Sequence, residues 1–114
     1  MRRGEVRWYT FRAPDKRRPV VILTRDSAIG YLTSLTVAPI TTTIRDIPTE
    51  VFLSRDEDRT LQDCVANLDN IQTVSQGKLG SLITRLSRLR MEEVDKAICF
   101  ALGVDDFHLY RNRP

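Results

Sequence analysis

Hydrophobic residues recur with a period of two over most of this chain, a pattern typical of β-strands. In the segment 5–11, Val6 and Trp8 alternate with Arg7 and Tyr9, the run 19–24 is continuously apolar, and the segment 32–40 alternates and is rich in β-branched residues. Two more strands are predicted at 49–53 and 63–68, with the polar stretch 54–60 as a loop between them. The shorter segments 71–74 and 79–86 predict a turn and a last strand.

At Ser87 the hydrophobic period changes to three and four, which predicts one amphipathic helix. Ser87 is suited to cap the first turn of this helix, and Gly103 is suited to end it. The expected fold is therefore mainly β with α, in the α+β class: a small, strongly twisted antiparallel sheet curled into a partial barrel, with the C-terminal helix packed on or beside it.

The chain has 114 residues, which is the size of one domain with a single modest core. We expect this domain to span residues 1–104 and the polar residues 105–114 to form a weakly ordered tail. No apolar run approaches the roughly 18 residues needed to span a bilayer, and the first residues lack the apolar stretch of a signal peptide. We therefore expect a soluble, cytoplasmic protein.

The two cysteines, Cys64 and Cys99, lie among apolar neighbours, where reduced thiols behave as small hydrophobic groups. Their spacing matches neither a disulfide framework nor a zinc site. His108 is the single histidine of the chain. We therefore expect no metal ion and no cofactor.

The net charge of +3 is unevenly distributed along the chain. Residues 1–25 carry eight basic and two acidic side chains, and fifteen of the eighteen basic residues in the whole chain are arginine. Because a guanidinium binds phosphate oxygens in pairs and stays charged at physiological pH, this bias favours a polyanionic partner. The alternative is an ordinary solvated basic face.

Two of the predicted strands place a basic and a hydroxyl side chain together. If 19–24 and 35–40 pair as antiparallel neighbours, full overlap requires partners whose residue numbers add to 59, so Arg18 lies opposite Thr41. The side chains expected beside this pair are Lys16, Arg17, Thr42, Thr43 and Arg45. This set of hydrogen-bond donors, with Asp15 and Asp46 as its acids, suits a phosphate or a phosphodiester.

The composition also limits the chemistry that such a site supports. The acids are too scattered for two-metal hydrolysis, and one histidine cannot form a paired-histidine ribonuclease site. Metal-free RNA cleavage remains, in which the 2′-hydroxyl of the substrate is the nucleophile and the protein stabilises the phosphorane. Taken separately, an Arg-Arg-Pro strand start and a run of threonines are also ordinary strand chemistry.

The order of motifs along the chain resembles the MazF/PemK toxin family over residues 2–104. The motifs are RGEV at 3–6, RPVVIL at 18–23, VAPITT at 37–42, TEV at 49–51, DCVANLDNIQT at 63–73 and ALG at 101–103. The resemblance implies a homodimeric, sequence-specific, metal-independent endoribonuclease of a bacterial toxin–antitoxin pair. It also implies a barrel related to the SH3-like fold, of the kind shared with gyrase-poison toxins.

The resemblance further implies roles for individual residues. Arg18 falls on the family's catalytic arginine and Thr41 on its partner threonine, with a 2′,3′-cyclic phosphate and a 5′-hydroxyl as the products. The segment 69–73 corresponds to a part of the family that helps to read unstacked bases. Asp69, Asn70 and Gln72 are therefore expected at the RNA, although Asn70 is equally suited to a turn.

The first loop departs from the family pattern. Many members have a Gly-Ser-Glu stretch before the Arg-Pro motif, whereas the segment 10–17 of this chain is shorter and more basic. The family's glutamate therefore has no clear counterpart. Asp15 either replaces it or pairs with Arg17 or Lys16.

The resemblance implies two protein partners, a second copy of the chain and an antitoxin whose acidic, disordered segment folds onto the basic groove. We expect the dimer interface near the sheet at 53–67 and the closing helix. The competing interpretation is a binding module of the same fold that grips nucleic acid or protein without cutting it, as a gyrase-poison toxin does. Cleavage of RNA distinguishes the two.

Overall fold

The computed structural model of the chain describes residues 1–12 and 16–104. The expected C-terminal tail, 105–114, and Asp15 lie outside the described residues. The strands are β1 (Glu5–Thr10), β2 (Arg17–Ile22), β3 (Ser34–Thr41), β4 (Glu50–Leu53), β5 (Cys64–Asn67), β6 (Gln72–Ser75) and β7 (Leu82–Arg85). The helices are α1 (Asp26–Ile29), α2 (Arg55–Asp58) and α3 (Arg88–Leu102), with 3-10 turns η1 (Leu68–Asn70) and η2 (Gln76–Lys78).

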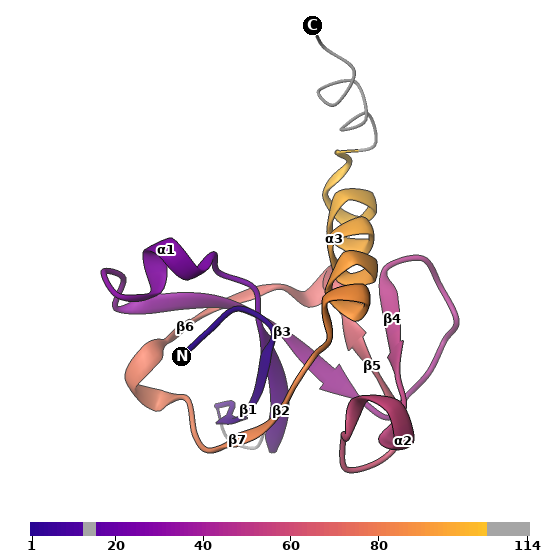
Figure 1. The fold of residues 1–114 in the computed structure, drawn as a ribbon, viewed down its shortest axis with the longest axis horizontal. Coiled ribbons are helices and arrows are strands. Elements are labelled where there is room, and N and C mark those ends of the chain that lie inside the picture. Colours follow the sequence, from indigo (N-terminus) through magenta and orange to yellow (C-terminus); the bar gives the residue numbers. More distant parts are fainter. Residues whose placement is uncertain (13–15, 105–114) are drawn as a thin grey trace, which may run out of the picture.

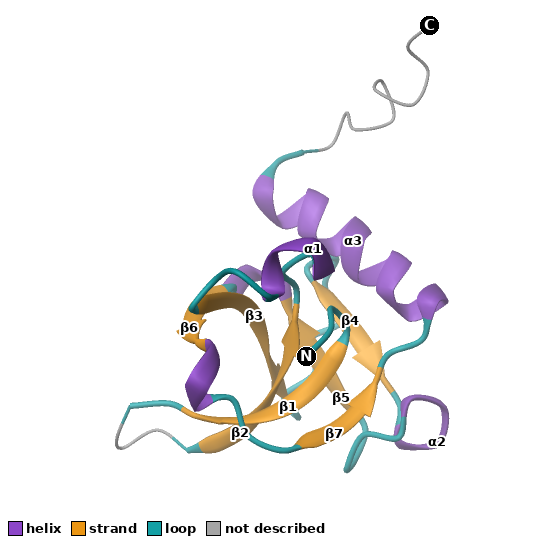
Figure 2. Ribbon diagram, turned by 60° about the vertical axis from the view of Figure 1, so that its left-hand side comes forward, coloured by secondary structure: helices purple, strands orange, loops and turns teal. Residues whose placement is uncertain are grey.

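The strands form one curled antiparallel sheet in the order β4-β5-β3-β2-β1-β7, and β6 also pairs with β3. Figure 2 shows this sheet curling into a half-barrel, with α3 running along one end of it. Figure 1 shows α3 beside β4 and β5, and α1 beside the part of β3 that lies away from α3. The predicted fold, a twisted partial barrel with a C-terminal helix, is confirmed.

The predicted register between the second and third strands is also confirmed. Val20 pairs with Pro39 and Ile22 with Val37, so that partner numbers add to 59. Both runs are largely apolar, and in this register they overlap fully. The same register, continued to the end of the sheet, sets Arg18 opposite Thr41.

The two faces of the sheet cover two hydrophobic cores. Val21 and Ala38 belong to the core beneath α3, whereas Val20 and Val37 belong to the core on the other face, beside α1. Because successive side chains of a strand point to opposite faces, Arg18 shares the face of Val20. The core that the buried residues of a strand join therefore indicates on which face of the sheet each residue at the rim lies.

The ends of α3 agree with the sequence prediction. The Ser87 hydroxyl accepts a hydrogen bond from the Arg90 backbone N–H at 3.1 Å, and Gly103 ends the helix in the left-handed region at φ 75°. Met91, Val94 and Ala97 form its buried stripe. Among the described residues, no helix is long and apolar enough to cross a membrane.

Three local predictions were wrong. The loop predicted at 54–60 contains α2, because Ser54 caps a one-turn helix by accepting from the Glu57 N–H at 2.9 Å. The predicted turn at 71–74 is largely strand β6, which is held by its pairing with β3. Cys64 is buried as expected, but Cys99 is only partly buried.

Candidate functional site

Arg18 and Thr41 line one hollow at the rim of the sheet. The hollow has a volume of about 190 Å³ and is formed by Arg18, Pro39, Thr41, Thr43, Arg45, Glu50, Asn67 and Asn70. We call it the rim hollow. Arg18 comes from β2 and Thr41 from the last position of β3, so the β2–β3 register brings the two together.

The Arg18 guanidinium has no acidic partner among the described residues. Among residues 1–12 and 16–104, no carboxylate lies within 4.0 Å of it, whereas Arg3, Arg7 and Arg90 each form an ion pair. The ring of Phe11 lies beside the guanidinium, with 6.0 Å between the ring centroid and the guanidinium carbon. A half-buried arginine side chain whose guanidinium forms no ion pair within residues 1–12 and 16–104 is suited to receive an anion from solution.

The Thr41 hydroxyl is oriented by the backbone that follows it. Its oxygen accepts a hydrogen bond from the Thr43 N–H at 3.2 Å. A hydroxyl has two acceptor sites and one donor, so this contact leaves its proton available for an anionic ligand. Arg18 and Thr41 therefore both present donors to the rim hollow.

The loop 42–49 carries Arg45 into the same hollow, and Glu50 fixes this loop. The Glu50 Oε1 accepts a hydrogen bond from the Arg45 backbone N–H at 2.8 Å, while the Glu50 backbone N–H donates to the Ile47 carbonyl at 2.9 Å. Asp46 reverses the chain direction with φ 56°. The Glu50 Oε2 is buried and has no hydrogen-bond partner among the residues that the structure describes.

Sequence reasoning missed Glu50, since it counted Asp15 and Asp46 as the acids near the site. The signal was present in the alternation of β4, where Val51 and Leu53 are buried and Glu50 must take the other face. Asp46, by contrast, is exposed and does not line the rim hollow.

A second hollow of about 190 Å³ adjoins the first; we call it the side hollow. It is lined by Phe11, Arg18, Pro39, Asn70 and Gln72. It shares Arg18 and Asn70 with the rim hollow, so the predicted base-reading residues Asn70 and Gln72 lie directly beside Arg18. Phe11, the aromatic side chain of this hollow, was not among the predicted site residues.

Asp69 lines neither the rim hollow nor the side hollow, but its hydrogen bonds hold the segments that do. Its Oδ2 accepts a hydrogen bond from the Thr49 hydroxyl at 2.6 Å, and its backbone N–H donates to the Asn67 Oδ1 at 2.9 Å. These bonds tie the loop before β4 to the turn η1 that carries Asn70. In this structure the Asp69 carboxylate is engaged by Thr49.

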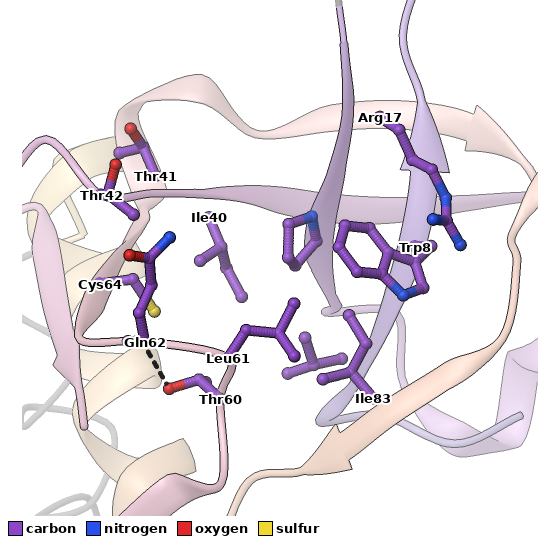
Figure 3. Close-up of a pocket in the computed structure, with 12 residues that line it drawn as sticks. Trp8, Arg17, Ile40, Thr41, Thr42, Thr60, Leu61, Gln62, Cys64 and Ile83 are labelled. Atoms are coloured by element: carbon purple, nitrogen blue, oxygen red, sulfur yellow. Dashed lines mark hydrogen bonds between the residues drawn. The ribbon is translucent and has the colours of Figure 1, made fainter. Parts of the chain in front are cut away.

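The remaining predicted residues are divided between the two faces of the sheet. Arg17 points away from Arg18 and lies over Trp8, with 4.2 Å between the guanidinium carbon and the ring centroid. Figure 3 shows this pair at one end of a third hollow, with Thr41 and Thr42 at the other end. This hollow, the Trp8 hollow, has a volume of about 220 Å³. Lys16 is exposed and lines none of the three hollows.

The predicted single cluster was therefore wrong in one respect. Arg17 and Thr42 line the Trp8 hollow, whereas Thr43 and Arg45 line the rim hollow with Arg18. Adjacent strand residues alternate between faces, and this separates Arg17 from Arg18.

Cys64 lies at the Trp8 hollow and is 3% exposed. Burial raises the pKa of its thiol above the ordinary value, and the nearby Asp58 and Asp63 carboxylates act in the same direction against a hydrogen bond with Thr60. A protonated thiol is a poor nucleophile. Within the described residues, no group of three or more histidine, cysteine or acidic side chains is placed to hold a metal ion.

Known proteins resemble this chain both in sequence and in fold. A family described as "PemK-like, MazF-like toxin of type II toxin-antitoxin system" matches residues 2–102. The chain is 44% identical over 102 residues to the probable endoribonuclease MazF5 of Mycobacterium tuberculosis, with 90% of this chain and 89% of that protein covered.

Solved structures are similar over nearly the whole chain. The Mycobacterium tuberculosis toxin MazF-mt6 superposes with a TM-score of 0.80 at 37% identity, covering 89% of this chain and 98% of that one. A mycobacterial endoribonuclease in complex with its cognate antitoxin superposes with a TM-score of 0.81 at 26% identity, covering 91% and 96%.

Proposed function

We propose a mechanism for this chain, which belongs to the PemK-like, MazF-like toxin family of type II toxin–antitoxin systems and is an endoribonuclease. Its substrate is single-stranded RNA in the bacterial cytoplasm, and cutting messenger RNA inhibits translation and growth. The reacting phosphodiester occupies the rim hollow. The observation that carries this proposal is that Arg18, which has no acidic partner in the described part of the chain, shares the hollow with Thr41.

The cleavage step uses a nucleophile that the RNA itself supplies. The 2′-oxygen loses its proton and bonds to the neighbouring phosphorus, the bond from phosphorus to the 5′-oxygen breaks, and the leaving 5′-oxygen takes up a proton. The products are a 2′,3′-cyclic phosphate and a 5′-hydroxyl. No water molecule enters the bond, so the step is a transfer within the substrate.

Arg18 and Thr41 act on the charge that develops at phosphorus. The Arg18 guanidinium donates to the phosphorane oxygens, and its positive charge is most effective where the surrounding protein excludes water. The Thr41 hydroxyl donates to another phosphate oxygen, because its own oxygen is held by the Thr43 N–H. Arg45 adds a second positive charge to the hollow, and the reaction proceeds without a metal ion or cofactor.

The bases next to the cleaved bond lie in the side hollow. The Phe11 ring offers a stacking surface, and the amides of Asn70 and Gln72 are able to donate to and accept from a base edge. Amides placed beside the reacting phosphate give the enzyme its sequence preference. Lys16, Arg17, Thr42 and Thr43 bind the phosphate backbone on either side, and Asp69 keeps the Asn70 turn in place.

Two protein partners complete the function. The antitoxin places an acidic segment over the basic rim and blocks the substrate, a proposal supported by the solved complex of a similar endoribonuclease with its cognate antitoxin. A second copy of the chain packs against β4 and α3. The exposed side chains of Phe52 and Phe100, 46% and 58% accessible, support this face as the dimer interface.

The test is single-turnover cleavage of a short RNA in excess EDTA. Arg18→Ala and Thr41→Ala should each abolish most of the activity, while Arg88→Ala, which removes an exposed arginine on α3, should cut like the wild-type protein. A substrate with a 2′-deoxy sugar at the cleaved position should bind but not react. Undiminished cleavage by both rim variants would contradict the proposal.

A further inference from the structure

Glu50 is an acid in a hollow that otherwise presents donors. It begins β4 and lines the rim hollow together with Arg18, Thr41 and Arg45. One carboxylate oxygen, Oε1, accepts from the Arg45 N–H at 2.8 Å, and the other, Oε2, is buried without a partner in residues 1–12 and 16–104. A buried polar atom with no partner destabilises a fold, so its presence calls for a functional explanation.

The charge of Glu50 is not neutralised by the arginines around it. Within the described part of the chain, no ion pair joins Glu50 to Arg18, Arg45 or any other base. A carboxylate at this place repels the phosphate that Arg18 attracts. Charge alone therefore predicts that RNA binds more tightly when Glu50 is removed.

The hydrogen bonds of Glu50 point to a different role. Its backbone N–H closes the turn through the Ile47 carbonyl, and its side chain reaches back to the Arg45 N–H. Both bonds are made within one six-residue turn, in which Asp46 has a left-handed backbone. The carboxylate thereby fixes the backbone of Arg45, and with it the direction in which the Arg45 side chain leaves the loop.

We propose that Glu50 is a positioning residue of the cleavage site, whose Oε1 holds the loop 42–49 so that the Arg45 guanidinium meets the substrate phosphate beside Arg18 and Thr41. This inference rests on the proposed function, because it requires RNA in the rim hollow. Glu50 acts through its acceptor oxygen, and its negative charge is not required.

Two substitutions separate the acceptor from the charge. Glu50→Gln loses the charge but keeps a carbonyl oxygen that can accept from the Arg45 N–H. Glu50→Asp keeps the charge, but its side chain is one methylene shorter and does not reach. The readout is the affinity for a single-stranded RNA made unreactive by a 2′-deoxy sugar at the cleaved position, measured over a range of salt concentrations.

The proposal predicts opposite results for the two variants. Glu50→Gln should bind this RNA as tightly as the wild-type protein or more tightly. Glu50→Asp should bind about tenfold more weakly. The slope of its log affinity against log salt concentration should become shallower by about one, as is expected for Arg45→Ala. Equal or tighter binding by Glu50→Asp, or a tenfold loss in Glu50→Gln, would overturn the proposal.

A double-mutant comparison tests whether the effect passes through Arg45. In an Arg45→Ala background, Glu50→Asp should weaken RNA binding by no more than about twofold. A full additional loss would show that Glu50 acts by another route. Glu92→Ala, which removes an exposed acid on α3, is the matched control, and thermal unfolding confirms that each variant is folded.

Failure of this inference is distinguishable from failure of the proposed function. If Arg18→Ala and Arg45→Ala bind the RNA like the wild-type protein, the rim hollow is not the RNA site and the proposed function is wrong. If both weaken binding while Glu50→Asp does not, the site stands and the inference about Glu50 fails.

Discussion

Arg18 and Thr41 face the same hollow from opposed positions on β2 and β3, at the point where the two strands reach the rim of the sheet. The pairing of Val20 with Pro39 fixes their relative position, and Val20 is held in the core beside α1. The geometry of the proposed reaction therefore depends on strand register, which is a rigid property of the fold.

The proposed mechanism requires the hydroxyl of Thr41 but not its methyl group. Thr41→Ser should retain most of the cleavage rate, whereas Thr41→Ala should lose on the order of 10²-fold in the single-turnover rate. The measurement is single-turnover cleavage at saturating enzyme. Equal rates for the alanine and serine variants would remove the hydroxyl from the mechanism.

The shape of the Arg18 side chain matters as well as its charge. A lysine ammonium is a point charge and cannot donate in the two parallel directions of a guanidinium. Arg18→Lys should therefore retain RNA binding within about threefold but cleave at least about tenfold more slowly. A lysine variant that cleaves at the wild-type rate would show that a positive charge of any shape suffices.

Sequence preference should depend on the side hollow. Asn70→Ala and Gln72→Ala should cleave additional RNA sequences, with discrimination against a non-preferred base reduced by about tenfold. Ser75→Ala, which alters an exposed residue of β6 outside the segment 69–73, should leave the preference unchanged. Sequencing the ends produced from a mixed RNA pool measures the preference, and an unaltered pattern in both amide variants would exclude them from base reading.

The ion pair between Asp58 and Arg90 should support the stability of the fold. Arg90 donates through Nε and Nη2 to both Asp58 oxygens at 3.0 Å, and the Asp58 side chain is 4% exposed. Removing one partner leaves a buried charge, so Arg90→Ala should lower the free energy of unfolding by about 3 kcal/mol. Urea unfolding checks this value, and a change within about 0.5 kcal/mol, as expected for an exposed site, would contradict it.

Glu5 should make stability depend on pH in the acid range. Burial acts to raise the pKa of this carboxyl, but the hydrogen bond and charge of Arg7, a backbone hydrogen bond with Arg2 and the charge of the N-terminus together hold the pKa below its ordinary value of 4.5. A carboxyl whose pKa falls on folding adds stability above its unfolded pKa, and this stability is lost as the pH drops through the folded pKa.

The stability difference between the wild-type protein and Glu5→Gln should therefore be largest near neutral pH and should shrink as the solution is acidified. Urea unfolding at a series of pH values measures this difference. A difference that stays constant between neutral and acidic pH would show that the ionisation of Glu5 contributes nothing.

The sequence predicted the strand register because both partner runs are largely apolar and overlap fully in one alignment. It predicted the caps of α3 because Ser87 and Gly103 act through local backbone geometry. These features depend on neighbours in sequence or on strongly patterned partners. Such features can be predicted from the sequence without knowledge of the whole fold.

The missed features depend on loop geometry and on which face a residue takes. The alternation of β4 gives the face of Glu50, but its contact with the Arg45 N–H depends on the turn at Asp46, which the strand pattern does not predict. Arg17 was grouped with Arg18 by proximity in sequence, although strand alternation sends it to Trp8. Asp69 was assigned to RNA binding, but the distant Thr49 engages its carboxylate.

The central claim is that Arg18 and Thr41 promote attack by the 2′-hydroxyl of the RNA on its own phosphate. The most direct test is chemical analysis of the ends that the wild-type protein and Arg18→Ala produce from one RNA in excess EDTA. The account predicts 2′,3′-cyclic phosphate and 5′-hydroxyl ends from the wild-type protein, and their loss from the variant. Ends carrying a 5′-phosphate, or the same ends at the same rate from Arg18→Ala, would contradict it.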